Sequence, residues 1–138
     1  MPINPLQPGP VLLTRQIHDA KRAGKHFDIR IVKDQIAYSW ATRKEMPEPG
    51  KSIVIFQQPD HTAHYALSTD IFIPEGSYGH GSTVLDFVRK ANVEEGHPDG
   101  VMVLVSESSS GKERFLIRKL DGNKYGKTSW LLKNLSVK

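Results

Sequence analysis

The sequence predicts a mainly β fold, a single-domain antiparallel β-barrel of about eight strands with little helix. Short runs rich in Val, Ile, Leu, Phe and Trp recur along the chain, and segments containing Gly, Pro, Asn or Ser separate them. Within many runs apolar and polar residues alternate, which is the strand period. Such chains form barrels or sandwiches, and we expect a barrel. The length of 138 residues suits one hydrophobic core rather than two domains.

The N-terminal half contains four expected strands. Four prolines lie among the first ten residues, so residues 1–10 are expected to be an extended arm and 11–138 the barrel domain. A basic loop, a hairpin turn and a Pro/Gly loop separate strands expected at 11–17, 26–32, 36–42 and 52–57.

The C-terminal half is expected to continue the pattern. A short β run at 71–73 leads into a Gly-rich bend at 74–81, and strands are expected at 82–88, 100–106, 114–120 and 129–132. Only residues 84–93 could form a short helix, with strand as the alternative. The bend lacks the Gly-Lys-Ser/Thr spacing of a phosphate loop, so we interpret it as a tight turn.

Composition excludes several classes of protein. The chain has no cysteine, which excludes disulfides, cysteine-ligated metal centres and cysteine nucleophiles, and fits a reducing compartment. No apolar run is long enough to cross a bilayer, and the N-terminus lacks the features of a signal peptide. We therefore expect a cytoplasmic monomer with no membrane partner, associated with the nucleoid if its source is bacterial or archaeal.

Charge is modestly positive and unevenly distributed. Nineteen Lys and Arg against fifteen Asp and Glu give a net charge of +4. Basic residues gather between Arg15 and Lys44 and again between Lys112 and Lys127, with aromatic residues nearby. This distribution suits a nucleic-acid surface, and for charge alone an ordinary solvated face is the alternative.

One short segment is the most informative about function. His26, Asp28 and Arg30 alternate with Phe27 and Ile29, so strand geometry predicts the three polar side chains on one face and the two apolar ones in the core. Imidazole and carboxylate together ligate ions of the Mn, Zn or Fe kind rather than Ca. A guanidinium beside them can bind a phosphate. The alternative is an antiparallel strand with one solvated face.

Further residues could complete such a site. His18 directly follows the expected strand at 11–17, and it reaches His26 only if this strand and the one at 26–32 are neighbours. His61 and Tyr65 are four residues apart in an expected loop and could converge or could not.

Six short motifs keep a fixed order over residues 11–133. They are Gln16-x-His18-Asp19-Ala20, His26-Phe27-Asp28-Ile29-Arg30, Ser39-Trp40-Ala41, Asp60-His61-x-x-x-Tyr65, Ile73-Pro74-Glu75-Gly76-Ser77-Tyr78-Gly79-x-Gly81 and Trp130-Leu131-Leu132-Lys133. In this order they resemble the 3′-phosphoesterase domain family of the bacterial and archaeal end-joining ligase D proteins.

The resemblance implies a metal-dependent enzyme of DNA repair. In that family a β-barrel carries a site that trims DNA or mixed RNA–DNA 3′ ends. The site removes a terminal 3′ ribonucleoside and then the 3′ phosphate, leaving a hydroxyl. The implied cofactor is a divalent metal, with Mn²⁺ expected and Zn²⁺ or Co²⁺ as alternatives. The implied partners are DNA or RNA–DNA 3′ ends, and a separate DNA ligase or polymerase.

The resemblance also assigns roles by motif. The expected metal ligands are His18, His26 and Asp28. The expected catalytic residues, which would contact the scissile phosphate, are Arg30, His61 and Tyr65. The expected supporting residues are Gln16, Asp19 and Lys44. Arg30 and a protonated His61 would stabilise charge in the transition state, and His61 or Tyr65 could protonate the leaving oxygen.

The chain departs from the family's usual pattern in places. The spacer between His18 and His26 is longer, Pro59 replaces an acid, and Ile53 stands where a basic residue is common. The usual Val-Pro-Lys-Gly is Thr-Arg-Lys-Glu at 42–45. Two alternatives therefore accompany the enzyme: a non-catalytic nucleic-acid-end-binding module, and an unrelated β-barrel metal-binding module that acts on small molecules.

Overall fold

The structure is a computed structural model that describes residues 7–20, 24–67, 71–73, 81–97, 100–109 and 111–137. Its nine strands are β1 (Gly9–Ala20), β2 (Gly24–Lys33), β3 (Ile36–Thr42), β4 (Ser52–Thr62), β5 (Ile71–Ile73), β6 (Gly81–His97), β7 (Val101–Ser108), β8 (Gly111–Lys119) and β9 (Ser129–Asn134). One short helix, α1 (Ala63–Ala66), is present in the described part of the chain.

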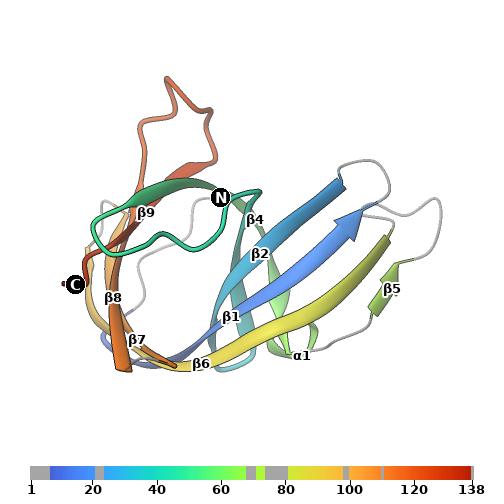
Figure 1. Ribbon diagram of the computed structural model, residues 1–138, viewed down its shortest axis with the longest axis horizontal. Coiled ribbons are helices and arrows are strands. Elements are labelled where there is room, and N and C mark those ends of the chain that lie inside the picture. The colour runs from blue at the N-terminus through green and yellow to red at the C-terminus, as the bar shows by residue number, and fades with distance from the viewer. Residues whose placement is uncertain are drawn as a thin grey trace.

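All nine strands belong to one antiparallel sheet with the order β1-β2-β3-β4-β9-β8-β7-β6-β5. An additional pairing of β1 with β6 closes eight of them into a barrel, and β5 extends the sheet beside β6 (Figure 1). The predicted single-domain antiparallel barrel is therefore confirmed. Closure leaves few free backbone edges, which protects the sheet against pairing with other chains.

Several element boundaries differ from those expected. β1 begins at Gly9, inside the expected arm, and residues 1–6 lie outside the described part. β4 runs on to Thr62 where a loop was expected, because its last residues still pair with β3. The possible helix at 84–93 is strand throughout. The Gly-rich bend lies outside the described residues from 74 to 80.

The long strand β6 closes the barrel. Its first part pairs with β1 up to Val93, and its last part, from Ala91 onward, pairs with β7. Register shifts occur at Arg15/Gln16 in β1 and at Val93/Glu95 in β6. Bulges of this kind bend a strand and increase its twist, so β6 can serve two neighbours in succession. In Figure 1 it sweeps across the lower side of the molecule.

The main core fills the barrel. Its members are buried apolar side chains from eight strands: Val11, Leu13, Ile29, Ile31, Trp40, Ile55, Val93, Met102, Leu104, Phe115, Ile117, Trp130 and Leu132. Trp40 and Trp130 meet edge to face with their ring centroids 5.5 Å apart, a favourable aromatic geometry.

A smaller cluster lies on the opposite face of β1, β2 and β3. Val32, Ala37 and Ala66 are buried there together, and Leu12 packs against them. The helix α1 therefore covers this face of the sheet. Its first turn is capped by Thr62, whose Oγ1 accepts a hydrogen bond of 3.1 Å from the Tyr65 N–H. No helix in the described ranges has the length and apolarity needed to span a membrane.

We predict that the two core tryptophans respond differently to the same substitution. Trp130 Nε1 donates to Gln57 Oε1 at 3.2 Å, whereas Trp40 Nε1 is buried without a hydrogen-bond partner among the described residues. Trp130→Phe should therefore cost about 1 kcal/mol more in free energy of unfolding than Trp40→Phe, because it leaves Gln57 unpaired. Urea unfolding of both variants measures the difference. Equal losses would contradict the assigned hydrogen bond.

Candidate active site

Three candidate metal ligands converge from β1 and β2. His18 lies directly opposite His26 in the β1–β2 ladder, which satisfies the condition that their strands be neighbours. Asp28 Oδ2 is 3.6 Å from His18 Nδ1, and its Oδ1 is 3.3 Å from His26 Nε2. One ligand atom from each residue lies within 4.8 Å of the others. Two imidazoles and a carboxylate, largely shielded from solvent, fit a divalent ion of the Mn or Zn kind.

The electrostatics of this cluster favour the protonated form of His26. The hydrogen bond to Asp28 is the largest cause that raises the pKa of His26 above 6.5, opposed by burial and by the charge of Arg43. A metal ion bound here would compete with that proton, because ligation requires the neutral ring.

Arg30 is held rigidly beside the cluster. The residue is 2% exposed, and its Nε donates to Ser39 Oγ at 2.9 Å. Nη1 donates to Gln16 Oε1, and Nη2 lies 3.7 Å from Asp28 Oδ2. Burial lowers the pKa of Arg30 and Asp28 opposes that effect, but arginine remains charged in proteins. The guanidinium is therefore a fixed cation with a defined orientation.

Gln16 connects the strand face to α1. It is fully buried, its Oε1 accepts from Arg30, and its Nε2 donates to the Tyr65 backbone oxygen at 2.9 Å. The Tyr65 ring lies over the Arg30 guanidinium, 5.1 Å from Cζ to ring centroid. The expected supporting position of Gln16 thus has a physical basis: it orients Arg30 and anchors the helix that covers it.

His61 and Tyr65 do meet, although not in a loop. His61 is near the end of β4 and Tyr65 is in α1, and their rings stack 4.6 Å apart at an interplanar angle of 16°. Burial lowers the pKa of His61 below 6.5, and the positive charge of Arg30 lowers it further. Both effects favour the neutral ring in the free site, and a protonated His61 in the active form stays a prediction.

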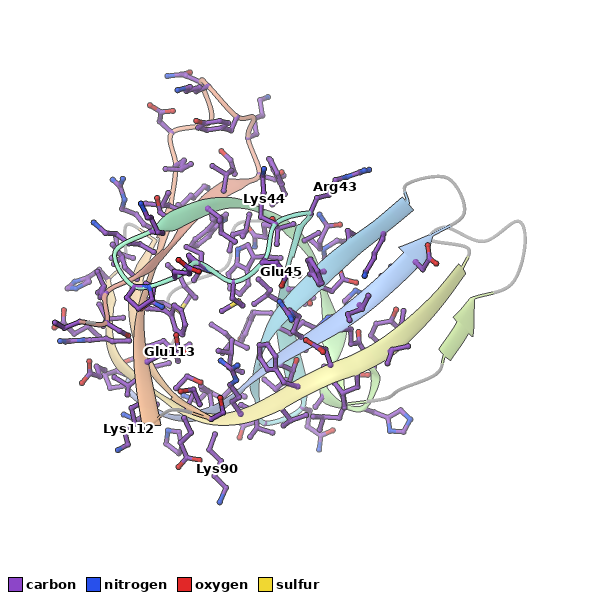
Figure 2. The ribbon with its side chains drawn as sticks, in the orientation of Figure 1. Arg43, Lys44, Glu45, Lys90, Lys112 and Glu113 are labelled. Carbon is purple, nitrogen blue, oxygen red and sulfur yellow. The ribbon has the colours of Figure 1, made fainter. Side chains whose placement is uncertain are left out.

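Two expected supporting residues lie away from the cluster. Asp19 is exposed and follows His18 in β1, so strand alternation turns it to the other side of the sheet. Lys44 is exposed in the bend after β3, where its backbone N–H donates to Thr42 Oγ1 at 3.1 Å (Figure 2). The described contacts of the cluster include neither side chain.

The face of β2 that carries Asp28 and Arg30 is not the solvated strand face that was considered as an alternative. Asp28 and Arg30 are 6% and 2% exposed, so this face is buried as thoroughly as the core face that carries Ile29. Phe27 is also buried, and the Arg15 guanidinium lies 4.6 Å from its ring centroid. An ordinary wet face does not enclose a carboxylate and a guanidinium in this way.

Ser39 and Arg43 belong to the site but were missed as site residues. Ser39 pairs with Arg30 in the β2–β3 ladder, which explains their hydrogen bond. The same ladder pairs Phe27 with Thr42, so Arg43 is the next residue along, at the level of His26. Its charge acts on the pKa of His26. A correct strand register drawn from the sequence would have indicated both.

Comparison with known proteins identifies the family. The family model described as the DNA Ligase D 3′-phosphoesterase domain matches residues 16–131, and the chain belongs to this family. Among curated relatives are the multifunctional non-homologous end joining protein LigD of Mycobacterium bovis and the multifunctional non-homologous end joining DNA repair protein LigD of Mycobacterium tuberculosis. Each is 25% identical over 114 residues, which cover 80% of this chain. The chain matches only 15% of the length of these relatives.

We predict opposite shifts for the two site histidines in metal-free protein. A side-chain NMR titration should place the pKa of His26 above 6.5 and that of His61 below it. The His26–Asp28 pair then stabilises the fold fully below pH 6.5, and this stability is lost as pH rises through the folded-state pKa. For His61 the sign is reversed: stability is lost as pH falls from 6.5 through its lowered value.

Asp28→Asn provides the control for this titration. It removes the carboxylate that favours the protonated ring, so the pKa of His26 should fall. A pKa of His26 that is unchanged by this substitution would contradict the arrangement of the cluster.

Proposed function

We propose that this protein is a metal-dependent phosphoesterase that processes DNA or RNA–DNA 3′ ends. It would remove a terminal 3′ ribonucleoside, a 3′ phosphate or both, and leave a 3′ hydroxyl for end joining. The proposal rests mainly on one observation: three candidate metal ligands, His18, His26 and Asp28, lie beside the buried and oriented side chain of Arg30. The chain also belongs to the ligase D 3′-phosphoesterase domain family.

His18, His26 and Asp28 would hold the metal ion, with Mn²⁺ as our first choice and Zn²⁺ or Co²⁺ as alternatives. When bound, a divalent ion polarises phosphoryl oxygens and neutralises charge on them. The chemistry of the three donors supports this assignment, because mixed nitrogen and oxygen ligation suits these ions.

Arg30 would bind the scissile phosphate. Ser39 and Gln16 hold two of its nitrogens, so the guanidinium is fixed before the substrate arrives. A preorganised cation stabilises developing negative charge without having to reorganise during the reaction. The Tyr65 ring against Arg30 would exclude water from one side of the phosphate.

His61 would act as the general acid that protonates the leaving oxygen. In the free site Arg30 disfavours the imidazolium. A phosphate anion bound to Arg30 would offset that repulsion and raise the pKa of His61, so that the ring takes up a proton together with the substrate. That proton then passes from the ring nitrogen to the departing oxygen, and stacking on Tyr65 keeps the ring in place.

A labelled primer–template tests the proposal. Substrates that end in a 3′ ribonucleotide or a 3′ phosphate are incubated with Mn²⁺, Zn²⁺ or Co²⁺, and with chelator as the control. Metal-dependent release of nucleoside or phosphate is the expected result. Binding of the substrate without release under any metal would instead support the non-catalytic end-binding module.

We predict that Asp28→Asn removes turnover and weakens Mn²⁺ binding. Loss of a direct ligand should exceed the roughly 10–100-fold effect typical of an outer-shell partner. The matched control is Asp34→Asn in the β2–β3 turn, where φ is +55°, a conformation that asparagine also tolerates. Calorimetric Mn²⁺ titration and primer-trimming rates measure both variants. Wild-type Mn²⁺ affinity in Asp28→Asn would exclude this carboxylate as a ligand.

We predict that His61→Ala lowers turnover about 10²–10⁴-fold while Mn²⁺ affinity stays at the wild-type value. The pH profile adds a second readout. If substrate binding raises the pKa of His61, the alkaline decline of kcat should lie at higher pH than that of kcat/KM, which reports the free enzyme. Turnover at the wild-type rate in His61→Ala would remove His61 from the site.

A further inference from the structure

A hollow lies at the loop between β8 and β9, away from the candidate active site. It has a volume of about 490 Å³ and is lined by residues that include Arg118, Lys119, Asp121, Lys124, Tyr125 and Ser129. None of these residues belongs to the His18–His26–Asp28 cluster. A volume of this size suits a small ligand or one unit of a polymer.

We propose that this hollow binds one nucleotide of a nucleic-acid strand, away from the 3′ end that is processed. The base would stack on Tyr125, and the neighbouring phosphates would lie against Arg118 and Lys124. The identity of the strand rests on the proposed function, whereas the chemistry of the hollow is a separate observation.

The charges of the hollow favour a polyanion. Three of its side chains, Arg118, Lys119 and Lys124, are cationic, and Asp121 is the one acid among its lining residues. Asp121 is engaged in the loop itself, because its Oδ1 accepts the Asn123 N–H at 2.9 Å. The surplus of positive charge is therefore available to a ligand.

The exposed ring of Tyr125 favours a nucleotide over other anionic ligands of the hollow. Tyr125 is 47% exposed, an unusual position for a large aromatic ring, and Lys124 Nζ lies 5.2 Å from its ring centroid. An exposed ring beside cations is the arrangement with which proteins bind single strands, where bases stack and phosphates are neutralised. A free phosphate would use the cations but not the ring.

The loop that presents Tyr125 is fixed to the barrel. In Figure 1 it stands out above the β8–β9 end of the sheet. The Gln57 N–H donates to the Thr128 oxygen at 2.8 Å, and Ser129 Oγ donates to the Gly126 oxygen at 2.6 Å. Gly126 has a φ of +103°, which a residue with a side chain would rarely adopt. These bonds fix the end of the loop that follows Tyr125 to the barrel.

The register relates the hollow to the metal-ligand cluster. Asp28 pairs with Ala41, Ala41 with Phe56, and Phe56 with Ser129, so Asp28 and Ser129 lie in one row across β2, β3, β4 and β9. Three strand spacings of about 4.8 Å give about 14 Å along the sheet. Only strands long enough to span that separation should reach both places.

Binding of a length series tests the proposal. Single-stranded oligonucleotides with a 3′ hydroxyl, from about 2 to about 12 nucleotides long, are titrated by fluorescence anisotropy in chelator. Tyr125→Ala should weaken binding of the long oligonucleotides about tenfold and leave the shortest ones unchanged, while Tyr125→Phe retains wild-type affinity. Lys124→Ala should weaken long-strand binding and reduce its dependence on salt. Lys112→Ala is the matched control, since Lys112 lies at the lower end of the molecule in Figure 2, opposite the loop.

The outcomes separate the hollow from the proposed enzyme. If no variant or wild-type protein turns over a 3′-modified primer but Tyr125→Ala still weakens long-strand binding, the hollow stands and the enzyme fails. If both Tyr125→Ala and Lys124→Ala bind long strands with wild-type affinity, the hollow is not a binding site for a nucleic-acid strand. Equally tight binding of an acidic peptide also overturns the proposal.

Discussion

The buried guanidinium of Arg30 is the constraint on which the site depends. An isolated buried charge costs several kcal/mol unless partners surround it, and here the partners come from three different elements. Gln16 is on β1, Asp28 is beside it on β2, and Ser39 is on β3. Gln16 also holds α1 through the Tyr65 backbone. The polar contacts of the Arg30 guanidinium therefore connect β1, β2 and β3, and through Gln16 they also connect these strands to α1.

Stability and chemistry occupy opposite faces of the same strands. Ile29 and Ile31 point into the main core, while Asp28 and Arg30, alternating with them, point to the face covered by α1. The long, bulged strand β6 closes the barrel by pairing with β1 and then with β7. A rigid core thus supports polar side chains whose geometry has to be kept, and substitutions on the α1 face can change the proposed chemistry without opening the core.

Under the proposed function the site would bind an anion and a cation together. Asp28 raises the pKa of His26 and would attract a metal ion, whereas Arg30 lowers the pKa of His61 and would attract a phosphate. The departure from the family's usual motif at 42–45 adds to this balance, because Arg43 comes to the level of His26 and acts on its pKa. The pKa values of the two histidines are therefore shifted in opposite directions, upward for His26 and downward for His61.

The sequence by itself determined a mainly β chain, and it determined that His26, Asp28 and Arg30 share one face, because the period of a strand is a local property of two residues. Closure into a barrel rather than a sandwich was decided by the pairing of β1 with β6. Only the tertiary structure determined which side chains from different strands come into contact. His18 joins the cluster because β1 pairs with β2 in one register. His61 meets Tyr65 because β4 continues to Thr62 and a one-turn helix follows. Likewise Arg43 acts on the pKa of His26 because the β2–β3 ladder, which pairs Phe27 with Thr42, brings the next residue to the level of His26.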